Sequence, residues 1–142
     1  MSNIIKIEDG CKTYDIVNEK GDVLGHFSFN PSDVDIVNRH AEVVDELNRL
    51  KAELSNNTKE KGVSETLKEV NAIVYEKVNY LFNADVANVF FSIMGPFSPL
   101  ASGKFFVEEV IDAIGQAIQA ETGARVKRIK EKVRKATAKY HK

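Results

Sequence analysis

Residues 103–142 read GKFFVEEVIDAIGQAIQAETGARVKRIKEKVRKATAKYHK. In the first half, apolar residues recur every three or four positions, which predicts an amphipathic helix that begins after Ser102-Gly103. The expected buried face consists of Phe106, Val107, Val110, Ile111, Ile114 and Ile118. The same spacing continues in the second half through Val126, Ile129, Val133, Ala136 and Tyr140. We therefore expect helix there too, and not a disordered arm.

Two glycines interrupt this pattern. Gly115 and Gly123, surrounded by alanines, permit close approach of another helix, or they weaken the helix by about 1 kcal/mol each. The second possibility makes Thr122-Gly123 a candidate hinge, where a bend would redirect the rest of the helix.

Charge is strongly segregated along the chain, although the net charge is only −1. Residues 124–142 contain nine Lys or Arg and one acid, a net charge of +8, so residues 1–123 carry a net charge of −9. Such asymmetry favours either self-assembly, with the basic end of one copy on the acidic body of another, or an anionic partner for the basic segment.

The first thirty residues have the pattern of β-strands. The runs from Cys11 to Val17 and from Val23 to Phe29 are separated by five residues that include a glycine, which predicts a β-hairpin. Alternation in the second run places Phe27 and Phe29 on one buried face. The run Ile4–Ile7 is a candidate third strand.

Residues 30–33, Asn-Pro-Ser-Asp, predict the start of a helix, with Asn30 or Ser32 as the cap. The apolar stripe expected for this helix is Ile36, His40, Val43, Leu47, Leu50 and Leu54. Residues 55–63 predict a polar break, after which a second helix begins at Ser64 and returns antiparallel to the first.

A short, strongly apolar helix is expected next, with Asp85 as its cap. Its lack of a polar face indicates burial, and Gly95-Pro96 ends it. Together these elements predict an α+β fold, mainly α, in which an N-terminal β-hairpin of two or three strands packs on three or four helices. The chain is expected to form a single domain, 1–142, made of a β-rich part (1–30), a helical body (31–123) and a basic helical tail (124–142).

Residues of the types used in catalysis are too dispersed to suggest an active site. The histidines at 26, 40 and 141 lack metal-ligand spacing, and the only cysteine, Cys11, is most simply a strand residue, although Lys12 beside it can lower a thiol pKa. Carboxylate pairs such as Glu108 and Glu109 fit an exposed helix face. We expect no enzymatic activity, no cofactor and no metal.

The basic segment is the main candidate for a binding site. Its apolar stripe favours a protein-binding helix, for which the candidate residues are Arg125, Val126, Arg128, Ile129, Lys132, Val133, Lys135 and Tyr140. Nucleic-acid binding is the alternative for nine positive charges, but only Tyr140 is available for base stacking and the acidic body repels a polyanion. A solvated C-terminus with no partner is the third possibility.

The order of parts resembles a known family, the tail assembly chaperones encoded in phages and prophages of Gram-positive bacteria. The similarity lies in a β-rich start, the motif Phe29-Asn30-Pro31-Ser32-Asp33, a charged helix, an aromatic segment before a proline turn, and a Lys/Arg-rich segment from Arg128 to Lys142. The resemblance implies a non-catalytic protein that binds tape-measure and tail-tube proteins during tail assembly and often forms homo-oligomers. A structural component of the virion tail is an alternative within the same setting.

The cellular location is an expectation from the sequence as well. Apolar runs are shorter than the roughly 18–20 residues of a membrane span, and the start Met1-Ser-Asn-Ile-Ile-Lys lacks the order of a signal peptide. We expect the protein in the cytoplasm, which for the family it resembles is that of the infected host cell, without membrane association.

Overall fold

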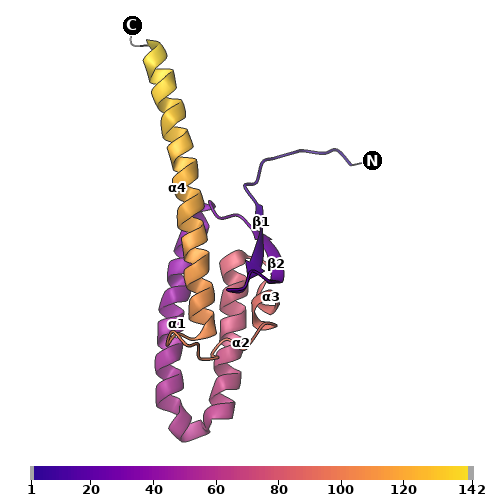
Figure 1. The fold of residues 1–142 in the computed structure, drawn as a ribbon, viewed down its shortest axis with the longest axis vertical. Helices are drawn as coiled ribbons and strands as arrows, with labels where there is room; N and C mark the ends of the chain where they lie inside the picture. The colour runs from indigo at the N-terminus through magenta and orange to yellow at the C-terminus, as the bar shows by residue number, and fades with distance from the viewer. Residues whose placement is uncertain (1, 141–142) are drawn as a thin grey trace.

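Figure 1 shows the computed structural model of the chain, in which a two-stranded sheet and three helices gather around the first half of a long C-terminal helix. The structure describes the backbone of residues 2–140 and the side chains of 2–55, 62, 64–136. The α+β fold, mainly α, is confirmed, with an N-terminal β-hairpin of two strands and four helices.

The hairpin pairs β1 (Lys12–Val17) with β2 (Val23–Phe29) in antiparallel register, so that Tyr14 lies opposite Phe27. Phe27 and Phe29 are buried, as the alternation predicts, and their rings meet those of Phe82 and Phe90. This aromatic cluster fixes the sheet on the helices, which a lone hairpin needs in order to be stable in water.

The expected third strand at Ile4–Ile7 is not formed. Among the described residues, 2–11 have no strand pairing, and the three isoleucines at 4, 5 and 7 are 80–85% exposed. The chain turns away before β1 at Gly10, which has φ +77°, and it leaves the hairpin as an extended arm. A strand needs a neighbour to accept its hydrogen bonds, and the turn at Gly10 carries the arm away from β2.

Helices α1 (Val34–Lys61) and α2 (Val63–Phe82) form the predicted antiparallel pair. The expected stripe of α1 is confirmed, because Ile36, Val43, Leu47 and Leu50 are buried while His40 and Leu54 are partly buried. The predicted break at 55–63 is wrong, since α1 continues to Lys61 and reverses at Gly62, where φ is +86°. Ser, Asn and Thr are weak helix formers but do not stop a helix, whereas a glycine with positive φ leaves the helical conformation and ends it.

The cap residues differ from those expected. Asp33, and not Asn30 or Ser32, accepts the N–H of Asp35 at 3.0 Å at the start of α1. Asn30 instead accepts the N–H of Ser32 at 3.1 Å. Both are turns in which a short polar side chain bonds the backbone two residues further on.

Helix α3 (Ala87–Phe91) is short, and Ala87, Phe90 and Phe91 are buried, as predicted. It ends at Phe91 and not at Gly95-Pro96, which leaves Met94 exposed, and Asp85 does not cap it. The N–H groups of Val86 and Ala87 both donate to Oδ1 of Asn79, each at 2.8 Å. Asn79 belongs to α2, so the start of α3 is bonded to the helix before it.

Helix α4 (Phe106–Tyr140) is continuous through Thr122-Gly123, so the candidate hinge is not bent (Figure 1). Five of the six residues expected on its buried face are buried, and Phe106 is partly buried. It crosses α1 closely at Gly115, where a Cβ atom would lie 3.0 Å from the His40 ring, and Nε2 of His40 bonds the Ile111 carbonyl oxygen at 2.9 Å. The second half of α4 extends beyond the other helices (Figure 1).

Candidate protein-binding site on the C-terminal helix

Helix α4 leaves the body at a cluster of contacts around Arg125. Its guanidinium group donates to the Gly10 carbonyl oxygen at 3.0 Å, to Oγ of Ser32, and to Oε1 of Glu121 at 2.7 Å. One turn earlier, the Thr122 hydroxyl donates to the Pro31 carbonyl oxygen at 3.3 Å. Arg125 is therefore engaged within the chain, and the exposed part of the predicted surface begins at Val126.

Glu121 holds this cluster together. Its carboxylate accepts from Nζ of Lys12 at 2.8 Å and from Nε of Arg125 at 2.7 Å, and Nη2 of Arg128 lies 3.7 Å away. The hydrogen bond from Lys12, followed by that from Arg125, lowers the pKa of Glu121 below its ordinary value. Sequence reasoning missed Glu121 and Lys12 as a pair. The spacing of Glu121 and Arg125 was a visible signal, but that of Lys12, 109 residues away, was not.

Beyond Arg125 the apolar stripe lies open to solvent. Val126, Ile129 and Val133 are 42–62% exposed, and every residue from 126 to 136 is exposed. At about 100° per residue, these three positions lie on the same face of α4 as Ile111, Ile118 and Thr122. The exposed stripe is thus the continuation of the face that packs on α1 lower down.

Basic side chains border the stripe on both sides. By the same helical geometry, Arg125 and Lys132 lie along one flank with Arg128 further round on that side, whereas Lys135 lies nearly opposite the stripe. Lys127, Lys130 and Arg134 lie along the other flank, and Glu131 lies on the opposite face. Such a surface presents apolar contacts in its middle and positive charge at both edges. Of the predicted binding residues, Tyr140 has a side chain that lies outside the described residues.

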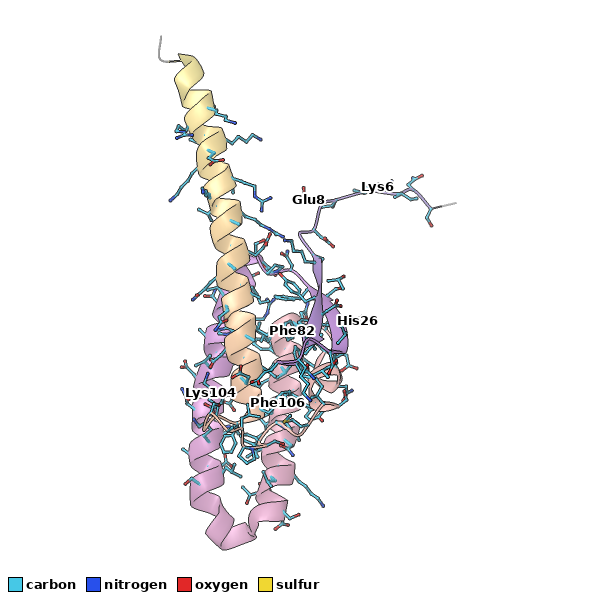
Figure 2. All side chains as sticks on the ribbon, in the orientation of Figure 1. Lys6, Glu8, His26, Phe82, Lys104 and Phe106 are labelled. Atoms are coloured by element: carbon cyan, nitrogen blue, oxygen red, sulfur yellow. The ribbon has the colours of Figure 1, made fainter. Side chains whose placement is uncertain are left out.

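The remaining candidate residues have ordinary surroundings. His26 is exposed and, by the alternation along β2, lies on the face opposite Phe27; Figure 2 shows it at the outer side of the hairpin. Cys11 precedes β1, and desolvation together with the Asp9 carboxylate raises the pKa of its thiol, so Lys12 does not activate it. Among the described residues, no group of three or more His, Cys, Asp or Glu is placed to hold a metal ion. No described helix is long and apolar enough to cross a membrane.

Comparison of the chain with protein-family models, with curated protein sequences and with solved structures found no match.

Proposed function

We propose that the protein is a non-catalytic assembly factor that binds another protein through the second half of α4. The observation that carries this proposal is the exposed stripe of Val126, Ile129 and Val133, bordered on both sides by Lys and Arg. A helix of this kind recognises a partner through apolar anchors spaced three and four residues apart, with charged pairs at the edges.

A protein partner accounts for features that a nucleic-acid partner does not need. Phosphate binding requires the positive charges alone, whereas a row of three branched apolar side chains gains only from contact with an apolar surface. Full burial of one such side chain is worth about 1.5–3 kcal/mol. The net charge of −9 on residues 1–123 also disfavours a polyanion close to the body.

The kind of partner follows from the resemblance to tail assembly chaperones. We propose tape-measure and tail-tube proteins as clients, bound in the cytoplasm of an infected cell before or during assembly of the tail tube, with a homo-oligomer as a further state. A structural role in the finished tail is the second candidate in this setting, and it requires the protein to be present in purified particles.

The test is a co-purification experiment with a phage tape-measure protein and a tail-tube protein. A triple variant, Val126→Ser, Ile129→Ser and Val133→Ser, is expected to lose the client, while Leu24→Ser, which alters an apolar residue on β2 that is as exposed as Val126, is expected to retain it. Retention of the client by the triple variant, with helix content unchanged by circular dichroism, would contradict the proposal. Gel retardation of DNA at low salt by the wild type, lost in Lys→Glu variants of α4, would favour nucleic acid instead.

Self-assembly is tested separately. Removal of residues 124–142 should lower the mass measured by light scattering if the basic segment joins copies of the chain. An unchanged mass would remove the homo-oligomer from the proposal and leave client binding untouched.

A further inference from the structure

The N-terminal arm, residues 2–9, presents a second exposed apolar surface. Ile4, Ile5 and Ile7 are among the most exposed large apolar side chains of the described chain. Figure 2 shows the arm, with Lys6 and Glu8 labelled, running outward from the hairpin on the side where α4 leaves the body. A row of isoleucines held in water is costly unless another surface covers it.

The root of the arm is fixed to α4. The Gly10 carbonyl oxygen accepts from Arg125, the Asp9 carbonyl oxygen accepts from Nδ2 of Asn30 at 2.6 Å, and Lys12 pairs with Glu121. Gly10 has φ +77°, and a Cβ atom there would lie 2.7 Å from Nη1 of Arg125. The base of the arm is therefore held beside α4, whereas Figure 2 shows that the arm beyond Glu8 runs away from this helix. The arm has to swing toward α4 to contact a ligand on the exposed stripe.

The arm and the stripe border the same cleft. It has a volume of about 690 Å³, and Ile7, Glu8 and Asp9 line it from the arm. Arg125, Arg128 and Ile129 line it from α4. By helical geometry the arm lies on the Arg125 and Arg128 flank of the stripe, so a ligand seated on Ile129 would meet Ile7 at its side.

We propose that the arm and the second half of α4 together bind one amphipathic helix of a partner protein. The flanks of this partner helix carry acidic residues. The proposal rests on the protein-binding function proposed above and adds the N-terminal arm as a second part of the binding site. A helix is the fitting occupant because the stripe continues the face of α4 that α1 covers lower down. Acidic flanks follow from the basic residues on both sides of the stripe.

A second copy of the same half of α4 does not fit this description. Two copies of residues 124–142 would bring net charges of +8 face to face, and like charges across a helix pair are repulsive. The acidic helix therefore does not come from the second half of α4 in another copy, and an acidic helix of a separate partner protein fits the site.

The test uses the full chain and a fluorescein-labelled helical peptide that has Leu at every third and fourth position and Glu on both flanks. Fluorescence anisotropy gives the Kd for the wild type and three variants. The arm variant Ile4→Ser, Ile5→Ser and Ile7→Ser is expected to bind at least about tenfold more weakly. The stripe variant Val126→Ser, Ile129→Ser and Val133→Ser should lose binding, and Leu24→Ser should bind as the wild type does.

The outcomes separate the two proposals. Wild-type affinity of the arm variant together with lost binding by the stripe variant overturns the arm as a second part of the binding site and leaves the proposed function intact. Wild-type affinity of the stripe variant overturns both. Because residues 2–9 lie outside the helices and strands, the arm variant is expected to fold normally.

Spin labels provide a second readout that does not depend on affinity. In a Cys11→Ser background, labels at Lys6→Cys and Lys130→Cys report the separation of the arm from α4. Saturating peptide should shift this distance distribution to shorter values as the arm closes over the helix. A distribution that the peptide leaves unchanged overturns the proposal.

Discussion

Arg125 on α4 donates from Nη2 to the Gly10 carbonyl oxygen at 3.0 Å, which joins two points 115 residues apart in the sequence. This contact ties the base of the N-terminal arm to the place where α4 leaves the body. Arg125 therefore belongs to the folded body, although it lies in the basic segment.

The variant Arg125→Ala should therefore destabilise the fold, whereas the exposed basic residues beyond Arg128 should have little effect on the free energy of unfolding. The change removes hydrogen bonds to Gly10, Ser32 and Glu121. We expect a loss of about 1–2 kcal/mol in the free energy of unfolding, because the site is only partly buried. Urea unfolding measures it, and Arg134→Ala, at an exposed position, serves as the control. Equal effects of the two variants would contradict the assigned contacts.

Glu121 predicts a dependence of stability on pH. Lys12 and Arg125 lower its pKa in the folded protein from the ordinary value of 4.5. Its contribution to stability is therefore complete above pH 4.5 and is lost as pH falls through the lower, folded-state pKa. The difference in unfolding free energy between the wild type and Glu121→Gln should be constant near neutral pH and shrink below pH 4.5. If the difference in unfolding free energy grew on acidification, it would contradict a lowered pKa of Glu121 in the folded protein.

The surroundings of the two glycines of α4 predict that a side chain is tolerated at Gly123 but not at Gly115. Gly115→Val should destabilise the protein by about 1–3 kcal/mol, because the new Cβ atom would lie 3.0 Å from His40, which is itself bonded to Ile111. Gly123 has no neighbouring atom within 4 Å of such a Cβ atom. Gly123→Val should change stability by no more than about 0.5 kcal/mol. Thermal unfolding of both variants decides the matter.

Asn79 and Asp85 provide a direct test of which side chain caps α3. Asn79→Ala leaves the buried Ala87 N–H without its acceptor, at an expected cost of about 1–3 kcal/mol, while the Val86 N–H keeps the Ala84 carbonyl oxygen at 3.0 Å. Asp85→Ala, at an exposed position, should change the free energy of unfolding by less than about 0.5 kcal/mol. The reverse ranking in urea unfolding would show that the local cap is the one used.

The cap of α3 also illustrates why some features follow from the sequence and others do not. The apolar stripes of α1 and α4 repeat over many residues, so each additional residue adds to the prediction of a helix and its buried face. A cap depends on a single side chain, and Asp85 is adjacent in sequence while Asn79 approaches only after α2 has folded. Local spacing therefore favoured the wrong residue.

The candidate site likewise has one part that the sequence predicts and another part that it does not. Val126, Ile129 and Val133 could be predicted to share a face from spacing alone, and the structure places them in solvent. The arm beside them could not be predicted, because the contacts of Arg125 with Gly10 and of Glu121 with Lys12 each join residues more than 100 positions apart. Ile4–Ile7 has the composition of a strand, but no neighbouring strand is placed to pair with it in the described chain.

The uninterrupted course of α4 through Gly123 sets a length. With a rise of 1.5 Å per residue, Ile129 stands about 21 Å along the helix axis from Gly115, where α1 crosses. Because α4 is one continuous helix whose first half is packed in the core, its second half keeps a fixed distance from the point where α1 crosses. Any chain seated on its outer half would be held clear of the acidic surface below, at a separation fixed by the number of helical turns.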